Sequence, residues 1–134
     1  MILVDTSAWV EFLRDTGSRT CEETDRLLEA GAAVTDPVAM EVLAGARNDQ
    51  HLRQLRGLLG RAQLLHCTPK DFDTAALLYR TCRGNGATIR RLVDCLIGAV
   101  AIRTGSPVLH ADRDFNVLAR HVGLAVHPSS LAEV

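Results

Sequence analysis

Four acidic residues are the first candidates for chemistry in this sequence: Asp5, Glu41, Asp94 and Asp112. Two of them lie in stretches that are otherwise apolar, and another directly follows the apolar run that begins the chain. A carboxylate on an apolar helix face costs several kcal/mol to desolvate unless it is paired or bound to a cation. The acids are therefore candidates for a cation site, provided that the fold brings them together.

Each acid also has a simpler interpretation, which the sequence leaves open. Asp5, Thr6 or Ser7 could cap the helix that follows, because these side chains accept hydrogen bonds from free backbone N–H groups. Glu41 could lie on the wet side of a short, half-buried helix. Thr6 and Ser7 are better explained as caps, whereas Asp5 is better explained as part of a site.

The later acids have structural alternatives too. Asp94 could form an ion pair with Arg90 or Arg91, which are one helical turn earlier. Asp112 could cap the helix that it opens, and it could do so while binding a cation. Asp114 could favour the positive end of the same helix, and this explains it better than metal binding does.

The elements that must position these acids alternate along the chain. Apolar runs predict strands at residues 1–4, 32–35, 62–66, 108–110 and 124–126. Periodic apolar residues predict helices at 8–15, 20–30, 37–46, 49–59, 70–83, 89–103 and 112–122. A capping box, Thr20-x-x-Glu23, starts the second helix, and Asn48 caps the fourth. Strands alternating with helices predict a three-layer α/β/α domain around a short parallel sheet.

This topology would gather the four acids at one edge. Asp5 and Asp112 follow strands, and Glu41 lies in the first turns of a helix after a strand, so all three belong at the carboxyl edge. The helix of Asp94 runs antiparallel to the strand that follows it. About ten helical residues follow Asp94, and at 1.5 Å each they span roughly 15 Å, which is the length of a short strand. Asp94 therefore lies level with the carboxyl end of that strand.

Four clustered carboxylates would repel one another unless a divalent cation neutralised them. Oxygen ligands without histidine or cysteine suit Mg²⁺ or Mn²⁺. Such an ion activates water and stabilises charge on a phosphate, which makes phosphodiester hydrolysis the natural reaction class.

Composition excludes several other classes. The chain has 134 residues, which fits one domain, and its net charge of −1 argues against bulk electrostatic binding of nucleic acid. The cysteines have no metal-site or disulfide-framework spacing and suggest a reducing cytoplasm: Cys21, Cys67, Cys82 and Cys95. No apolar stretch is long enough to span a membrane.

Four motifs together resemble the PIN-domain nucleases, specifically the VapC toxins of bacterial toxin–antitoxin pairs. They are Val-Asp-Thr-Ser at 4–7, Glu41 behind Asp-Pro at 36–37, Leu-Val-Asp-Cys-Leu-Ile at 92–97, and His-Ala-Asp-Arg-Asp-Phe at 110–115. The resemblance covers essentially all of residues 1–134, which it implies form a single PIN domain. It implies that the four acids bind the catalytic metal, with Asp114 as an accessory acid.

The resemblance further implies that Thr6 or Ser7 orients a carboxylate or water. Arg90, Arg91 and Arg113 are close enough in sequence to the acids to contact a phosphate, although surface charge or an acidic partner explains any one of them as well.

The function implied is that of an Mg²⁺-dependent endoribonuclease toxin acting on structured RNA, usually tRNA and sometimes rRNA. A cognate VapB-type antitoxin, a homodimer and a larger toxin–antitoxin complex are implied with it. The alternatives are a catalytically silent RNA-binding module and a DNA-directed PIN-type nuclease. A receiver domain would need a lysine near the last strands, but Lys70 lies far earlier.

Overall fold

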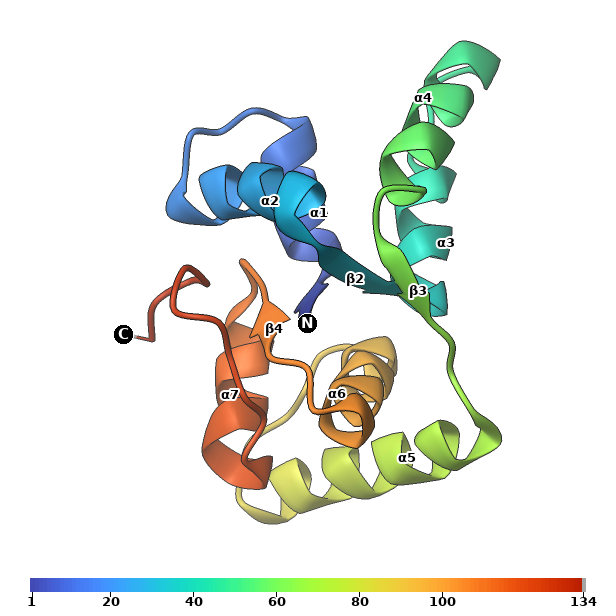
Figure 1. The fold of residues 1–134 in the computed structure, drawn as a ribbon. Coiled ribbons are helices and arrows are strands. Elements are labelled where there is room, and N and C mark those ends of the chain that lie inside the picture. Colours follow the sequence, from blue (N-terminus) through green and yellow to red (C-terminus); the bar gives the residue numbers. More distant parts are fainter. Residues whose placement is uncertain (134) are drawn as a thin grey trace.

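The computed structural model describes residues 1–133 and contains one parallel sheet. Its strands are β1 (Ile2–Val4), β2 (Ala32–Thr35), β3 (Gln63–Leu65) and β4 (Val108–Leu109). They are ordered β3-β2-β1-β4, and Leu3 pairs with both Ala33 and Val108 (Figure 1). The strand that precedes Asp5 is therefore central, and its two neighbours lead to the other candidate acids.

Helices cover both faces of this sheet. They are α1 (Thr6–Leu13), α2 (Arg19–Ala30), α3 (Asp36–Ala44), α4 (Asp49–Leu59), α5 (Pro69–Gly84), α6 (Leu92–Thr104) and α7 (Arg113–Val122). Figure 1 shows α1 and α2 on one side and α5, α6 and α7 on the other, with α3 and α4 extending from the β2–β3 side as a hairpin. The predicted three-layer arrangement is confirmed.

The core is aliphatic, as the composition requires. Leu3 and Val4 of β1 are fully buried, and Trp9 of α1 packs above them in the same cluster. Every residue of α6 from Asp94 to Ala101 is buried, whereas Leu92 and Ile102 near its two ends are exposed. Its one acid therefore lies inside the protein at the start of that helix.

The start of α6 differs from the prediction. The segment 89–91 is not helical, and α6 begins at Leu92 with Arg91 as its N-cap at φ −129°. The Ile89 side chain is buried in the hydrophobic core. The backbone N–H of Arg90 donates to Oδ2 of Asp114 at 3.1 Å. This hydrogen bond to α7 keeps the segment extended, although its sequence pattern predicts a helix.

The predicted fifth strand is reduced to one bridge, between Val108 and Val126. The residues that follow nevertheless cover the far side of β4. Ser130 is buried, and its hydroxyl accepts from the backbone N–H of His110 at 3.0 Å and donates to the carbonyl of Val108 at 3.2 Å. This tail is therefore not peripheral, because its polar groups complete the hydrogen bonding of β4.

The helix caps also differ in part. Asn48 and Asp112 cap α4 and α7 as predicted, but Ser18 rather than Thr20 caps α2. Thr20 is buried and donates to the carbonyl of Ser129 at 2.8 Å, so tertiary packing takes the hydroxyl that the capping box would use. Across residues 1–133, the cysteines are all free and no helix is both long and apolar enough to cross a membrane.

Candidate metal centre

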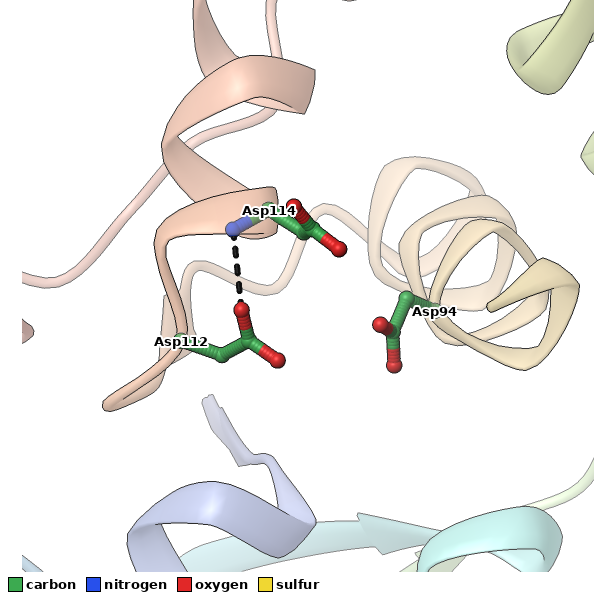
Figure 2. Close-up of side chains that lie close together, drawn as sticks. All are labelled: Asp94, Asp112 and Asp114. Atoms are coloured by element: carbon green, nitrogen blue, oxygen red, sulfur yellow. Dashed lines mark hydrogen bonds between the residues drawn. The ribbon is translucent and has the colours of Figure 1, made fainter. Parts of the chain in front are cut away.

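Three carboxylates converge where α6 and α7 begin. One oxygen from each of Asp94, Asp112 and Asp114 lies within 4.8 Å of the other two. Figure 2 shows the side chains turned toward one gap, Asp94 from the first turn of α6 and the other two from the start of α7. The sequence prediction that Asp94 and Asp112 come together is thus confirmed, and Asp114 joins them.

Local hydrogen bonds fix the start of α7. Oδ1 of Asp112 accepts from the backbone N–H of Asp114 at 3.0 Å, so this acid caps the helix while its other oxygen stays available (Figure 2). The backbone N–H of Asp112 donates to Nδ1 of His110 at 3.1 Å. Burial lowers the pKa of His110 to about 4, so its ring is neutral at pH 7 and can accept this bond.

Asp5 approaches the same gap from the end of β1. It caps α1, and its Oδ2 accepts from the backbone N–H of Ser7 at 3.0 Å and from the Ser7 hydroxyl at 2.6 Å. The same hydroxyl accepts from the backbone N–H of Ala111 at 2.9 Å. The prediction that Thr6 or Ser7 caps α1 was wrong, because Asp5 is the N-cap. Ser7 instead joins β1 to the loop that carries Asp112.

Burial makes the ionised forms of two acids costly. It raises the pKa of Asp5, and it raises the pKa of Asp94 to about 6, with the charge of Asp5 as the next largest cause. Both residues are at most 3% exposed, and Oδ1 of Asp5 and Oδ2 of Asp94 lack a hydrogen-bond partner within the described chain. Buried carboxylate oxygens without donors fit a site that a hard cation would complete.

Glu41 lies on the other side of Asp94, outside the group of three. Its Oε1 accepts from the Thr6 hydroxyl at 3.0 Å, which ties α3 to α1. Arg91 bridges it to Asp94, with Nη1 2.9 Å from Oε2 of Glu41 and Nη2 3.3 Å from Oδ1 of Asp94. The predicted edge therefore contains Glu41, and Arg91 lies between it and Asp94.

Arg90 forms ion pairs with the two acids at the start of α7. Its Nη2 donates to Oδ1 of Asp112 at 2.7 Å, and its Nε donates to Oδ2 of Asp114 at 3.0 Å. Of the two ion pairs that the sequence suggested for Asp94, the one with Arg91 is present, whereas Arg90 turns to α7 instead. Only the path of the 89–91 segment decides this, so helical spacing could not distinguish the two arginines.

Two adjoining hollows open onto these side chains. A hollow of about 270 Å³ is lined by Asp5, Ser7, Asp112 and Arg91 among others. A second, of about 210 Å³, is lined by Arg90, Arg91, Asp94 and Asp112. Arg113 is exposed and lines a third hollow beside α7, which Arg90 and Asp114 also line. The acids are thus reachable from solvent in spite of their burial, and Arg91 borders both openings.

Comparison with known sequences matches the PIN domain family over residues 2–121. The chain is 45% identical over 128 residues to VapC ribonuclease Mb1587 of Mycobacterium bovis, with 92% of this chain and 96% of the relative covered. Ribonuclease VapC51 of Mycobacterium tuberculosis is 32% identical over 122 residues, with 90% and 87% covered.

Solved structures share the fold. VapBC2 from Rickettsia felis, bound to a promoter DNA fragment, superposes with a TM-score of 0.76 at 19% identity, over 95% of this chain and 98% of that one. FitAcB from Neisseria gonorrhoeae gives a TM-score of 0.74 at 21% identity, over 96% and 98%.

Proposed function

Because the chain belongs to the PIN-domain family, among the VapC ribonucleases of toxin–antitoxin systems, we propose that it is an Mg²⁺-dependent endoribonuclease whose acid cluster is the catalytic centre. Asp5, Asp94 and Asp112 would hold the cation together with Glu41, and Asp114 would be an accessory ligand or an anchor for Arg90. Mn²⁺ has similar oxygen preferences and is the alternative ion.

The observation that carries this proposal is the pair of buried oxygens without donors, Oδ1 of Asp5 and Oδ2 of Asp94. A cluster built only for stability would pair these oxygens, because an unsatisfied buried acceptor costs about 1–3 kcal/mol. A divalent ion supplies charge for such oxygens, lowers the pKa of a coordinated water and stabilises negative charge on a phosphate.

The chain's own residues orient this centre. Ser7 holds Asp5 by two donors and ties it to the loop of Asp112, while Thr6 holds Glu41. These contacts fix the acids on rigid elements, which keeps the carboxylate positions set before substrate arrives. Attack by water in line with the leaving 3′ oxygen breaks the P–O bond and leaves a 5′-phosphate and a 3′-hydroxyl.

The substrate class that we infer is structured RNA, tRNA or rRNA. A cognate VapB-type antitoxin would neutralise the enzyme, since related solved structures are named as VapBC complexes. The proposal also includes a homodimer that assembles with the antitoxin into a larger complex, a single domain spanning residues 1–134, and a cytoplasmic site of action. RNA phosphates would meet Arg90, Arg91 or Arg113 around the acidic hollows.

The test is incubation of the antitoxin-free protein with total cellular RNA, followed by sequencing of new 5′-phosphate ends. Discrete ends should appear with Mg²⁺ and vanish with EDTA or in an Asp5→Ala variant. Asp73→Ala is the matched control, because Asp73 is an exposed acid on α5 away from the cluster. Retained RNA binding without cleavage in Mg²⁺ or Mn²⁺ would contradict the catalytic proposal and favour the binding module.

A further inference from the structure

Arg91 holds together two acids that come from different helices. Its guanidinium makes hydrogen bonds of 2.9 and 3.3 Å to the two oxygens of Glu41 on α3, and one of 3.3 Å to Oδ1 of Asp94 on α6. These are charge-assisted bonds, which are stronger than neutral ones. One cationic group therefore already pairs with two of the acids assigned to the metal.

The position of this guanidinium overlaps with the role of a metal ion. It uses Oδ1 of Asp94, while Oδ2 of the same carboxylate is buried without a partner. It borders the hollow beside Asp5 as well as the hollow beside Asp94. A cation that binds Glu41 as well as Asp94 must therefore compete with Arg91, because Arg91 contacts both oxygens of Glu41.

Arg90 differs from Arg91 in how it is anchored. Arg90 contacts Asp114 through its backbone N–H and through Nε, close to the main chain. Arg91 reaches its acids only with the two terminal nitrogens, and half of its side chain is exposed. Its long stem can rotate into solvent without disturbing the backbone, so Arg91 is the arginine that can leave.

We propose that Arg91 is an internal counter-ion for Glu41 and Asp94 that a divalent cation must displace, so that Arg91 sets the cation concentration at which the centre fills. This inference rests on the proposed metal centre, and it adds a residue that opposes metal binding. In the cation-free protein Arg91 stabilises the acids, and in the loaded protein its guanidinium is released from them.

The test measures cation binding directly, by titration calorimetry with Mg²⁺ and Mn²⁺ on the full chain and on an Arg91→Gln variant. Losing a half-exposed, charge-assisted competitor should tighten binding by about tenfold. The variant should also unfold at lower temperature without cation and gain more from Mg²⁺ than the unmodified protein. Arg53→Gln is the control, because it removes the same charge from an exposed side chain on α4 that lines neither hollow.

A second readout follows the guanidinium itself. The side-chain Nε–H resonance of Arg91, assigned by its loss in Arg91→Gln, should shift when Mg²⁺ is added. Equal cation affinity in the unmodified protein and in Arg91→Gln, or tightening of the same size in Arg53→Gln, would overturn the role of Arg91. Absence of cation binding in every variant would overturn the metal centre itself.

Discussion

The Ser7 hydroxyl lies 2.6 Å from Oδ2 of Asp5 and donates to it, while it accepts the backbone N–H of Ala111. A single side chain thus joins the end of β1 to the loop after β4. Because the two loops carry Asp5 and Asp112, the distance between these acids depends on Ser7.

Replacing Ser7 with alanine should therefore reduce RNA cleavage. The Ser7→Ala variant keeps the backbone donor to Asp5 but loses the bond to Ala111, and loss of such supporting contacts costs about 10–100-fold in metal affinity or activity. Initial cleavage rates at saturating Mg²⁺ measure the effect. Thr81→Ala is the control, since that hydroxyl bonds only within exposed α5. An unchanged rate in Ser7→Ala would contradict the role of Ser7.

Stabilisation by Mg²⁺ should be larger at pH 7.5 than at pH 5. Burial raises the folded-state pKa of Asp94 from 3.8 to about 6. The cation-free protein therefore loses stability as the pH rises from the unfolded pKa to the folded pKa. Below pH 6 the ion must displace a proton, whereas above it the carboxylate is already ionised. Thermal unfolding with and without Mg²⁺ tests this at both pH values. Asp94→Asn should abolish the difference between the two pH values. An equal rise in melting temperature with Mg²⁺ at both pH values in the unmodified protein would disprove the argument.

A second ion pair, far from the acid cluster, should govern acid stability. Hydrogen bonds from Arg103, at 2.9 and 3.0 Å, lower the pKa of the buried Asp71, which also accepts the backbone N–H of Thr68, the N-cap of α5. Asp71→Asn should lower the free energy of unfolding by about 2 kcal/mol at pH 7, because charged hydrogen bonds are lost.

This difference should disappear at low pH. The lowered folded pKa means that Asp71 contributes stability above the ordinary carboxyl range, and the contribution is lost as pH falls through the folded pKa. Urea denaturation from pH 7 to about pH 2 measures it, since the folded pKa lies below the ordinary carboxyl value. Asp73→Asn, an exposed neighbour on α5, serves as the control. A difference independent of pH would show that the charge of Asp71 is not responsible.

The chain end should contribute to stability rather than to chemistry. Ser130→Ala leaves the buried N–H of His110 without its acceptor, which should cost about 1–3 kcal/mol. Urea denaturation should show this loss, while cleavage by the folded fraction stays unchanged. Ser129→Ala, which removes a neighbouring hydroxyl and leaves the carbonyl that binds Thr20, should have little effect on stability. Equal stability of the two variants would contradict the anchoring role of Ser130.

Some of this arrangement followed from local patterns. The buried runs before Asp5 and Asp112 correctly predicted parallel strands, and Asn48 and Asp112 predicted helix starts correctly. These features depend on residues close in the chain, whose hydrogen bonds and apolar spacing are set locally. The pattern failed at Ile89, where a buried side chain and an anchor on Asp114 replace a helical turn.

Strand direction and helix length can be predicted from the sequence, and they fix which acids reach the carboxyl edge. How those acids are paired depends on the packing of the elements against one another. Arg90 reaches Asp112 across 22 residues and Arg91 reaches Glu41 across 50, through a segment whose path is set by packing. Ion pairs at such separations depend on where two elements meet in space, and neither charge nor periodicity along the chain records that distance.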